Sequence, residues 1–173
     1  PDALENGVPV GVSSWRQRSI NAIPPSMKSA ASYMNSILAK LEAKQHGYVE
    51  AIMLNEQGLV CEGTGENLFV VRDGILSTPP LSDGLLEGIT RDTIMCLADD
   101  LDIPVLEESL TRSDLYIADE VFFTGSAAEL TPIGSVDDRP VGKPGEITRA
   151  IQDRFFDVVY GRVEEYADWL TEI

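Results

Sequence analysis

Lys28 stands among small and apolar residues, in the stretch PPSMKSAAS at positions 24–32. An amine held away from water gives up its proton more readily, and a neutral amine can form a Schiff base with a carbonyl group. Tyr33 follows five residues later. Five helical steps place two side chains well apart, so the pair can converge only if Lys28 lies just before the helix. A solvent-facing lysine and a core tyrosine are the alternatives.

Glu62 is the first acid of the stretch CEGTGENLF, residues 61–69, and it follows a short predicted strand. A carboxylate beside a pyridine nitrogen keeps that nitrogen protonated, and a protonated pyridine ring withdraws electrons from a bound substrate. The two following glycines would let the chain turn tightly beside such a ring. A solvated acid in a turn is the alternative reading of the same pattern.

Two further stretches could bind an anion. Gly88, Ile89 and Thr90 open a predicted helix, where backbone N–H groups, the helix dipole and a hydroxyl favour negative charge. Ser126 and Ala127 follow an apolar strand and could present a hydroxyl and amides. A helix N-cap at Thr90 and a plain small-residue turn are the alternatives.

The composition disfavours several classes of protein. With 173 residues, 43% of them hydrophobic, the chain can form one domain with a core. A formal net charge of −16 disfavours binding to nucleic acid. No apolar run approaches the roughly 18–20 residues that a membrane span needs. One histidine and two cysteines do not suggest a metal site or a disulfide framework.

These features lead us to expect a cytoplasmic protein. The first ten residues lack the basic and apolar regions of a signal peptide, and the two cysteines fit a reduced compartment. Because the chain starts at Pro1, we expect a fragment or a processed piece. An acidic surface with few lysines fits either a salt-adapted protein or an ordinary acidic enzyme.

Short strands mixed with helices predict an α+β fold rather than a doubly wound parallel sheet. Apolar spacing indicates a helix from Met27 to about His46, with Met27, Ala30, Ala31, Met34, Ile37, Leu38 and Leu41 on its buried face. Two more helices are expected after Gly88 and over 146–160, with a short one near Trp169. Strands are expected at 8–15, 49–54, 59–61, 67–71, 75–77, 103–108, 119–125 and 129–136.

In their order and spacing, these motifs closely resemble the branched-chain amino acid aminotransferases, which are pyridoxal-phosphate enzymes of fold type IV. The resemblance runs essentially end to end. Its most specific parts are EGTGENLFVVRDGILSTPP at 62–80 and DLYIADEVFFTGSAAELTPI at 114–133. The supporting parts are VGVSSWRQRSINAIPPSMKSAASYMNS at 10–36 and LLEGITRDTI at 85–94.

The resemblance implies a role for each candidate residue. Lys28 matches the lysine that holds pyridoxal 5'-phosphate and moves the α-proton. Tyr33 matches the tyrosine at the cofactor's phenolic oxygen, Glu62 the acid at its pyridine nitrogen, and Leu86 the side chain on its ring face. The other matches are to phosphate- and carboxylate-binding groups. Gly88, Ile89, Thr90 and Ser126 match the phosphate site, and Ser126 and Ala127 carry the amides for the substrate carboxylate.

One position departs from the family. Where the family usually has a proline, this chain has Glu87, which would loosen the turn and add a negative charge near a phosphate. A Glu87 side chain that points to solvent would be harmless. Ser126 stands where threonine is common, and its hydroxyl could still reach the phosphate.

The resemblance also implies a fold and an activity. We expect residues 1–173 to be the C-terminal pyridoxal-phosphate domain, a pseudo-barrel of short, mostly antiparallel strands surrounded by helices. The family's N-terminal domain, which supplies an arginine and part of the substrate pocket, is absent from this chain. The expected reaction is transamination of leucine, isoleucine or valine with 2-oxoglutarate, in a homodimer or larger homo-oligomer. A D-amino acid transaminase, an aminodeoxychorismate-lyase-like enzyme and an inactive domain are the alternatives.

Overall fold

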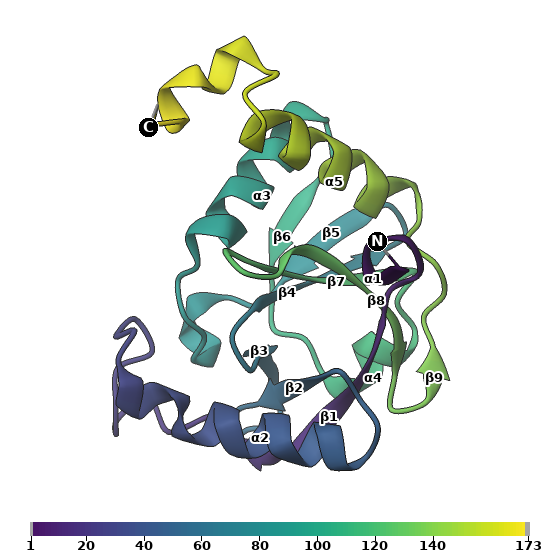
Figure 1. Ribbon diagram of the computed structural model, residues 1–173. Helices are drawn as coiled ribbons and strands as arrows, with labels where there is room; N and C mark the ends of the chain where they lie inside the picture. The colour runs from purple at the N-terminus through teal and green to yellow at the C-terminus, as the bar shows by residue number, and fades with distance from the viewer. Residues whose placement is uncertain (1, 172–173) are drawn as a thin grey trace.

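The computed structural model describes residues 2–171, which form one mixed sheet wrapped by helices. The strands of this part are β1 (Val8–Arg16), β2 (Glu50–Leu54), β3 (Val60–Gly63), β4 (Asn67–Arg72), β5 (Ile75–Thr78), β6 (Val105–Glu107), β7 (Glu120–Gly125), β8 (Glu129–Val136) and β9 (Arg139–Pro140). They follow the order β3-β2-β1-β8-β7-β4-β5-β6, with β9 beside β8, and curl into a partial barrel (Figure 1). The predicted α+β pseudo-barrel is confirmed.

The sheet mixes hairpins with parallel neighbours. β1 runs parallel to both β2 and β8, and β5 runs parallel to β6, while the other described pairings are antiparallel. The predicted hairpin turn between β4 and β5 has Asp73 and Gly74 with φ of 51° and 79°. Positive φ at both central residues is the geometry that matches the twist of a tight hairpin.

Helices cover the sheet on more than one side. In the described residues they are α1 (Asp2–Asn6), α2 (Tyr33–Gln45), α3 (Ile89–Asp100), α4 (Arg112–Tyr116) and α5 (Glu146–Val159), with short 3-10 turns η1 (Ala30–Ser32), η2 (Leu81–Asp83) and η3 (Glu164–Trp169). α1, α4 and β9 are elements that the sequence analysis misses. None of the helices between residues 2 and 171 is both long and apolar enough to cross a membrane.

α3 and α5 pack together over one part of the sheet (Figure 1). Ile94, Leu97 and Ala98 of α3 are fully buried, and they belong to one core cluster with Ile151 and Phe155 of α5. This cluster holds the central part of α3 against the sheet.

α2 packs with the opposite face from the one predicted. Its helix begins at Tyr33 instead of Met27, and its buried residues are small: Ser36, Ala39 and Ala43. The two alanines pack against Ala51 and Met53 of the sheet. Small side chains allow the helix backbone to approach the strands closely, whereas the larger apolar residues would not fit there. The residues predicted to be buried are exposed or only partly buried: Met27, Ala30, Ala31, Met34 (64% exposed), Ile37, Leu38 and Leu41.

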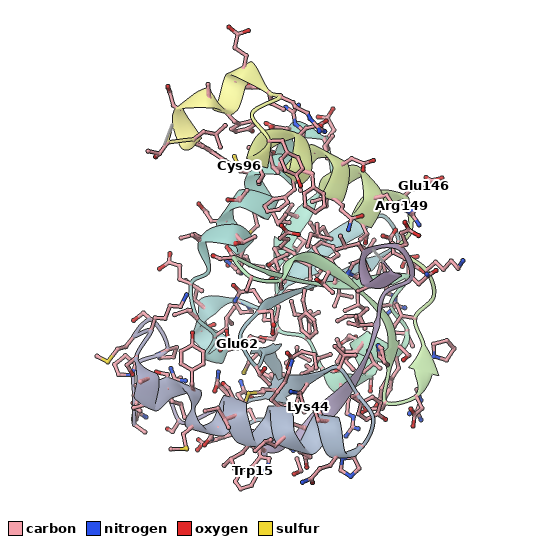
Figure 2. All side chains as sticks on the ribbon, viewed as in Figure 1. Trp15, Lys44, Glu62, Cys96, Glu146 and Arg149 are labelled. Atoms are coloured by element: carbon pink, nitrogen blue, oxygen red, sulfur yellow. The ribbon has the colours of Figure 1, made fainter. Side chains whose placement is uncertain are left out.

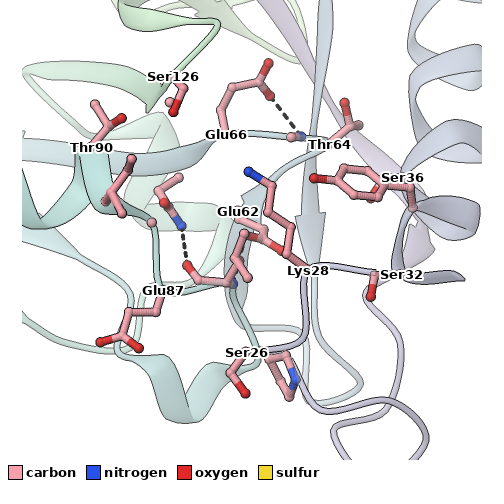
Figure 3. A pocket seen from close by; sticks show the side chains of 18 of the residues that line it. Ser26, Lys28, Ser32, Ser36, Glu62, Thr64, Glu66, Glu87, Thr90 and Ser126 are labelled. Atoms are coloured by element: carbon pink, nitrogen blue, oxygen red, sulfur yellow. Dashed lines mark hydrogen bonds between the residues drawn. The ribbon is translucent and has the colours of Figure 1, made fainter. Parts of the chain in front are cut away.

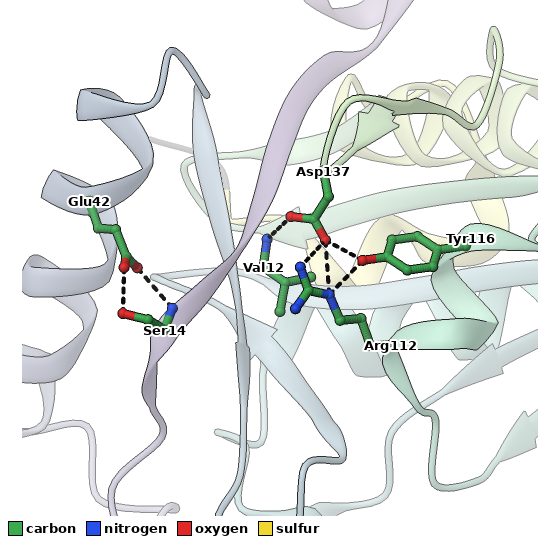
Figure 4. Close-up of polar contacts among 6 residues, drawn as sticks. All are labelled: Val12, Ser14, Glu42, Arg112, Tyr116 and Asp137. Carbon is green, nitrogen blue, oxygen red and sulfur yellow. Dashed lines mark hydrogen bonds and ion pairs between the residues drawn. The ribbon is translucent and has the colours of Figure 1, made fainter.

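Polar contacts fasten β1 to its surroundings away from the cavity described below (Figure 4). Asp137, in the turn before β9, accepts hydrogen bonds from the Val12 amide at 2.8 Å and the Tyr116 hydroxyl at 2.5 Å. It also pairs with Arg112 at 2.6 Å. Glu42 of α2 accepts a hydrogen bond from the Ser14 amide at 2.9 Å. Polar contacts therefore hold β1, the strand that leads to the cavity, on both of its sides.

Candidate active site

A cavity of about 260 Å³ opens between α2, the ends of β3 and β7, and the start of α3 (Figure 3). It brings together residues that are up to about a hundred positions apart in the sequence. Its lining includes all but one of the residues that the sequence analysis singles out, namely Lys28, Tyr33, Glu62, Leu86, Gly88, Ile89, Thr90 and Ser126. The exception, Ala127, is exposed and is not part of the lining.

Lys28 lies in the non-helical segment just before η1, and its amine points into the cavity (Figure 3). The residue is exposed, so the expectation that its neighbours hold it away from water is wrong. The Ser32 hydroxyl donates to the Met27 carbonyl at 2.9 Å, which folds this segment back on the start of α2. Tyr33 begins α2 and lines the same cavity. The two side chains meet at one site because Lys28 precedes the helix, which is the condition set by their spacing.

Glu62, in β3, places its carboxyl group in the cavity wall. One oxygen accepts a hydrogen bond from Gln17 Nε2 at 2.5 Å, and the other accepts one from the Leu86 amide at 3.1 Å. Burial raises the pKa of Glu62 to about 7, although these two donors and the Arg18 charge act in the opposite direction. The solvated-turn alternative is therefore wrong for Glu62.

Gly88 caps the N-terminus of α3 and has no room for a side chain. A Cβ at this position would lie 1.9 Å from Asn67 Oδ1. Asn67 in turn donates from Nδ2 to the Leu86 carbonyl at 2.9 Å, which fixes the loop before the helix. Because Gly88 is the N-cap, the N-cap reading of Thr90 is wrong: Thr90 is the second residue of α3 and is buried. The first turn of α3 faces the cavity.

Two buried polar atoms in the lining have no hydrogen-bond partner. They are Thr124 Oγ1, at the end of β7, and Arg18 Nε, just after β1. A buried polar atom without a partner costs about 1–3 kcal/mol, so such atoms in a cavity wall mark a place for a polar ligand. Both atoms can donate a hydrogen bond to an anionic oxygen.

Glu87 and Ser126 sit at the edges of the cavity. Glu87 is exposed, and its carboxylate points away from Lys28 and Thr90 (Figure 3). The acid in place of the family's proline therefore does not project among the anion-binding groups. Ser126 is exposed at the turn between β7 and β8, on the side of the cavity where Thr90 lies (Figure 3).

The sequence analysis misses three residues that shape this site: Gln17, Arg18 and Thr124. Gln17 and Arg18 follow a strand that ends about 45 positions before Glu62, and no local pattern links them to it. Thr124 had a usable signal, since it is a polar residue at the end of an apolar run and just before a glycine.

The sequence profile of the family described as amino-transferase class IV matches residues 1–136. The chain belongs to this family. Its membership fits the cavity, in which an inward-pointing lysine, a partly buried acid and a helix N-terminus meet.

Curated relatives and solved structures in the family match nearly the whole chain. The branched-chain-amino-acid aminotransferase of Escherichia coli (strain K12) is 47% identical over 174 residues, which are 99% of this chain and 56% of the relative. A structure of the branched-chain aminotransferase from Thermoproteus uzoniensis with norvaline is 51% identical with a TM-score of 0.93, and the match covers 95% of this chain and 55% of that one. The branched-chain amino acid aminotransferase from Thermobaculum terrenum, in its PLP (holo) form, is 45% identical with a TM-score of 0.93, over 95% and 54% of the two chains. This class IV aminotransferase chain thus spans little more than half the length of its relatives.

Proposed function

We propose that the chain is the cofactor-binding part of a branched-chain amino acid transaminase that carries pyridoxal 5'-phosphate on Lys28. The observation that supports this most directly is the meeting of Lys28, Glu62 and the start of α3 in one cavity. The parent enzyme would move an amino group between leucine, isoleucine or valine and 2-oxoglutarate. The relatives named above, all branched-chain aminotransferases, favour this substrate class over D-amino acids or aminodeoxychorismate.

The described residues fit such a cofactor. Glu62 offers a partly buried carboxyl group with a raised pKa, so a nearby cation, such as a protonated ring nitrogen, would stabilise its ionised form. Thr124 and Arg18 offer unpaired hydrogen-bond donors, and Gly88 and Ile89 at the N-terminus of α3 line the same cavity. When bound, the cofactor would supply a protonated ring that withdraws electrons from the substrate's Cα.

Each side chain then has a definite task. Lys28 Nζ would hold the cofactor, and as a free amine it would accept the proton of the substrate's Cα and return it. Glu62 would hold a proton at the ring nitrogen, and the hydrogen bonds from Gln17 and Leu86 keep the Glu62 carboxyl group in place. The Tyr33 hydroxyl would donate to the phenolic oxygen, and the Leu86 side chain would exclude water from the ring.

The anion-binding groups lie at the other end of the cavity. The amides of Gly88 and Ile89 and the hydroxyls of Thr90 and Ser126 would bind the phosphate, since a helix N-terminus favours negative charge. The amides of Ser126 and Ala127 would bind the substrate carboxylate.

The rest of the parent enzyme would complete this site. We assign residues 1–173 to a cofactor domain and expect another domain to supply an arginine to the phosphate and part of the substrate pocket. We further propose that the parent enzyme is a homodimer or larger homo-oligomer in the cytoplasm. It would bind neither nucleic acid nor membranes.

The test is to add pyridoxal 5'-phosphate to the 173-residue chain and to record its visible absorption. We expect a band that Lys28→Ala abolishes and that Lys44→Ala leaves unchanged, because Lys44 is exposed on α2 outside the cavity (Figure 2). Borohydride reduction followed by peptide mass spectrometry then locates the modified lysine. An unchanged band in Lys28→Ala would refute the assignment.

The substrate class is tested with the chain joined to its first domain. Turnover of leucine should exceed that of D-alanine and aminodeoxychorismate, and the isolated chain should be at best weakly active. A preference for D-alanine would instead identify the protein as a D-amino acid transaminase.

A further inference from the structure

One loop supplies a large part of the cavity wall. It runs from Pro80, just after β5, to Thr90, in the first turn of α3. Within it, the Leu86 amide donates to Glu62 at 3.1 Å. The position of this loop therefore decides both how the Glu62 carboxyl group is held and where the N-terminus of α3 meets the cavity. Its residues in the cavity lining are Leu86, Glu87, Gly88, Ile89 and Thr90.

Arg91 closes this loop at its base. Its Nη2 atom donates to the Pro79 carbonyl, 12 positions back in the chain, at 3.1 Å. The same atom donates to Glu107 Oε2 at 2.7 Å. Glu107 ends β6 and is the register partner of Thr78, which ends β5. One guanidinium group thus ties the first turn of α3 to the ends of two neighbouring strands.

Helix stability alone does not explain an arginine at this position. Arg91 is the third residue of α3, where a cation opposes the helix dipole. Its side chain is only 4% exposed, and a buried cation is unfavourable unless it is paired and hydrogen-bonded. The contacts with Pro79 and Glu107 offset this cost, and they give Arg91 the task of joining the helix to the strands.

The first half of the loop has anchors of its own. The Asp83 carbonyl accepts hydrogen bonds from Asn55 Nδ2 at 3.2 Å and from Cys61 Sγ at 3.0 Å. The Leu85 side chain is buried. We therefore expect the loss of Arg91 to disturb the end of the loop at the cavity more than the part around Asp83.

We propose that Arg91 is a positioning residue of the cavity. By holding the start of α3 against Pro79 and Glu107, it keeps the Leu86 amide on Glu62 and keeps the helix N-terminus facing the cavity. Arg91 does not line the cavity, so it acts through the backbone of the loop and not by touching a ligand. The effect on a bound phosphate rests on the proposed function, but the effect on the loop does not.

The first test records the backbone amide resonances of the chain by NMR without any ligand. Glu62→Gln shows how the Leu86 resonance changes when its acceptor is no longer a carboxyl group. In Arg91→Met, the Leu86 resonance should also move away from its wild-type position, whereas the amides of β7, in the middle of the sheet, should stay in place. An unchanged Leu86 resonance in folded Arg91→Met would overturn the proposal.

The chain offers a matched control in Arg149, which lies in the first turn of α5 (Figure 2). Its Nε atom donates to the Pro144 carbonyl at 3.2 Å, but the residue is exposed and α5 does not line the cavity. Arg149→Met should leave the Leu86 resonance unchanged. A loss of stability alone does not move the resonances of the folded state, so this comparison separates positioning from a merely structural role.

Two variants of Glu107 decide the question if Arg91→Met fails to fold. Glu107 is half exposed, so its substitution disturbs the core little. Glu107→Ala removes an acceptor of Arg91 and should move the Leu86 resonance in the direction seen for Arg91→Met, by a smaller amount. Glu107→Gln keeps an acceptor oxygen and should stay close to the wild type. Identical Leu86 resonances in the two variants would count against the proposal.

The second test measures the affinity for pyridoxal 5'-phosphate from the Lys28-dependent absorption band. Arg91→Met should bind about tenfold or more weakly, which is the factor for one hydrogen bond to a charged group. Arg149→Met should bind like the wild type. Circular dichroism checks that each variant is folded before its affinity is compared.

Pyridoxal, which lacks the phosphate group, shows which part of the loop matters more. A larger loss for pyridoxal 5'-phosphate than for pyridoxal assigns the effect to the N-terminus of α3, and an equal loss assigns it to the Leu86 contact with Glu62. Either result supports the proposal, and unchanged affinities for both compounds would overturn it. Failure of the proposed function would show separately, because the wild type would then lack a Lys28-dependent band while the resonance test still applies.

Discussion

The pH dependence of stability should reveal the buried acid at Glu62. Its pKa of about 7 lies above the ordinary 4.5, so the folded chain holds a proton that the unfolded chain has released between these values. The contribution of Glu62 to stability is therefore fully present below about pH 4.5, is lost as the pH rises from about 4.5 to about 7, and stays absent above that range. The difference corresponds to about 3 kcal/mol, at about 1.4 kcal/mol for each unit of pKa.

Glu62→Gln removes this term because an amide does not ionise. The amide keeps one oxygen for the donors Gln17 Nε2 and Leu86 N, so one donor loses its partner at a cost of about 1 kcal/mol at every pH. We expect the wild type to be more stable near pH 4.5 and Glu62→Gln to be more stable at pH 8. The two stability curves should therefore cross.

Urea unfolding of the cofactor-free chain at several pH values measures both curves. The difference between the wild type and Glu62→Gln isolates Glu62, because other titrating groups affect both proteins equally. Glu56→Gln, in an exposed turn, is the matched control and should follow the wild type. If Glu62→Gln loses stability in parallel with the wild type, the carboxyl group is not held in the protonated form and the reasoning fails.

Two further substitutions probe the cavity. Gly88→Ala should destabilise the chain by about 1–3 kcal/mol and weaken cofactor binding, because its methyl group would overlap the Asn67 side chain, whereas Gly65→Ala meets open space and should change stability little in the same urea assay. Thr124→Val should stabilise the cofactor-free chain by about 1 kcal/mol, since it removes an unpaired buried hydroxyl, and should weaken pyridoxal 5'-phosphate binding measured by absorbance titration. A destabilised Thr124→Val would show that this hydroxyl is not left without a partner.

Much of the site could be predicted from the sequence because its residues stand at the ends of elements. Lys28 precedes a helix, Glu62 lies at the end of a strand, and Gly88 opens a helix. Each of these positions can be recognised from the residues next to it in the sequence. Most strand and helix positions were predicted for the same reason, since turn residues separate clear apolar runs. The contact of Gln17 with Glu62 left no such local signal, because it depends on which loops the fold brings together.

The prediction for α2 failed for a physical reason. Apolar periodicity selects the large residues, here Met34 and Ile37, as the buried face. The helix instead buries Ala39 and Ala43, because only small side chains let it lie close to the sheet. A pattern of small residues at the same spacing was present in the sequence, but hydrophobicity alone gives it less weight than the methionines.

The close approach of Gly88 and Asn67 also limits which substitutions this loop can accept during evolution. The space between them holds one group, which is now the Asn67 amide. A methyl group at position 88 becomes tolerable only after position 67 shrinks, and a smaller residue at 67 gives up the hydrogen bond to Leu86. The two positions are therefore epistatic, and a library that varies one of them at a time would reject solutions that only a double substitution can reach.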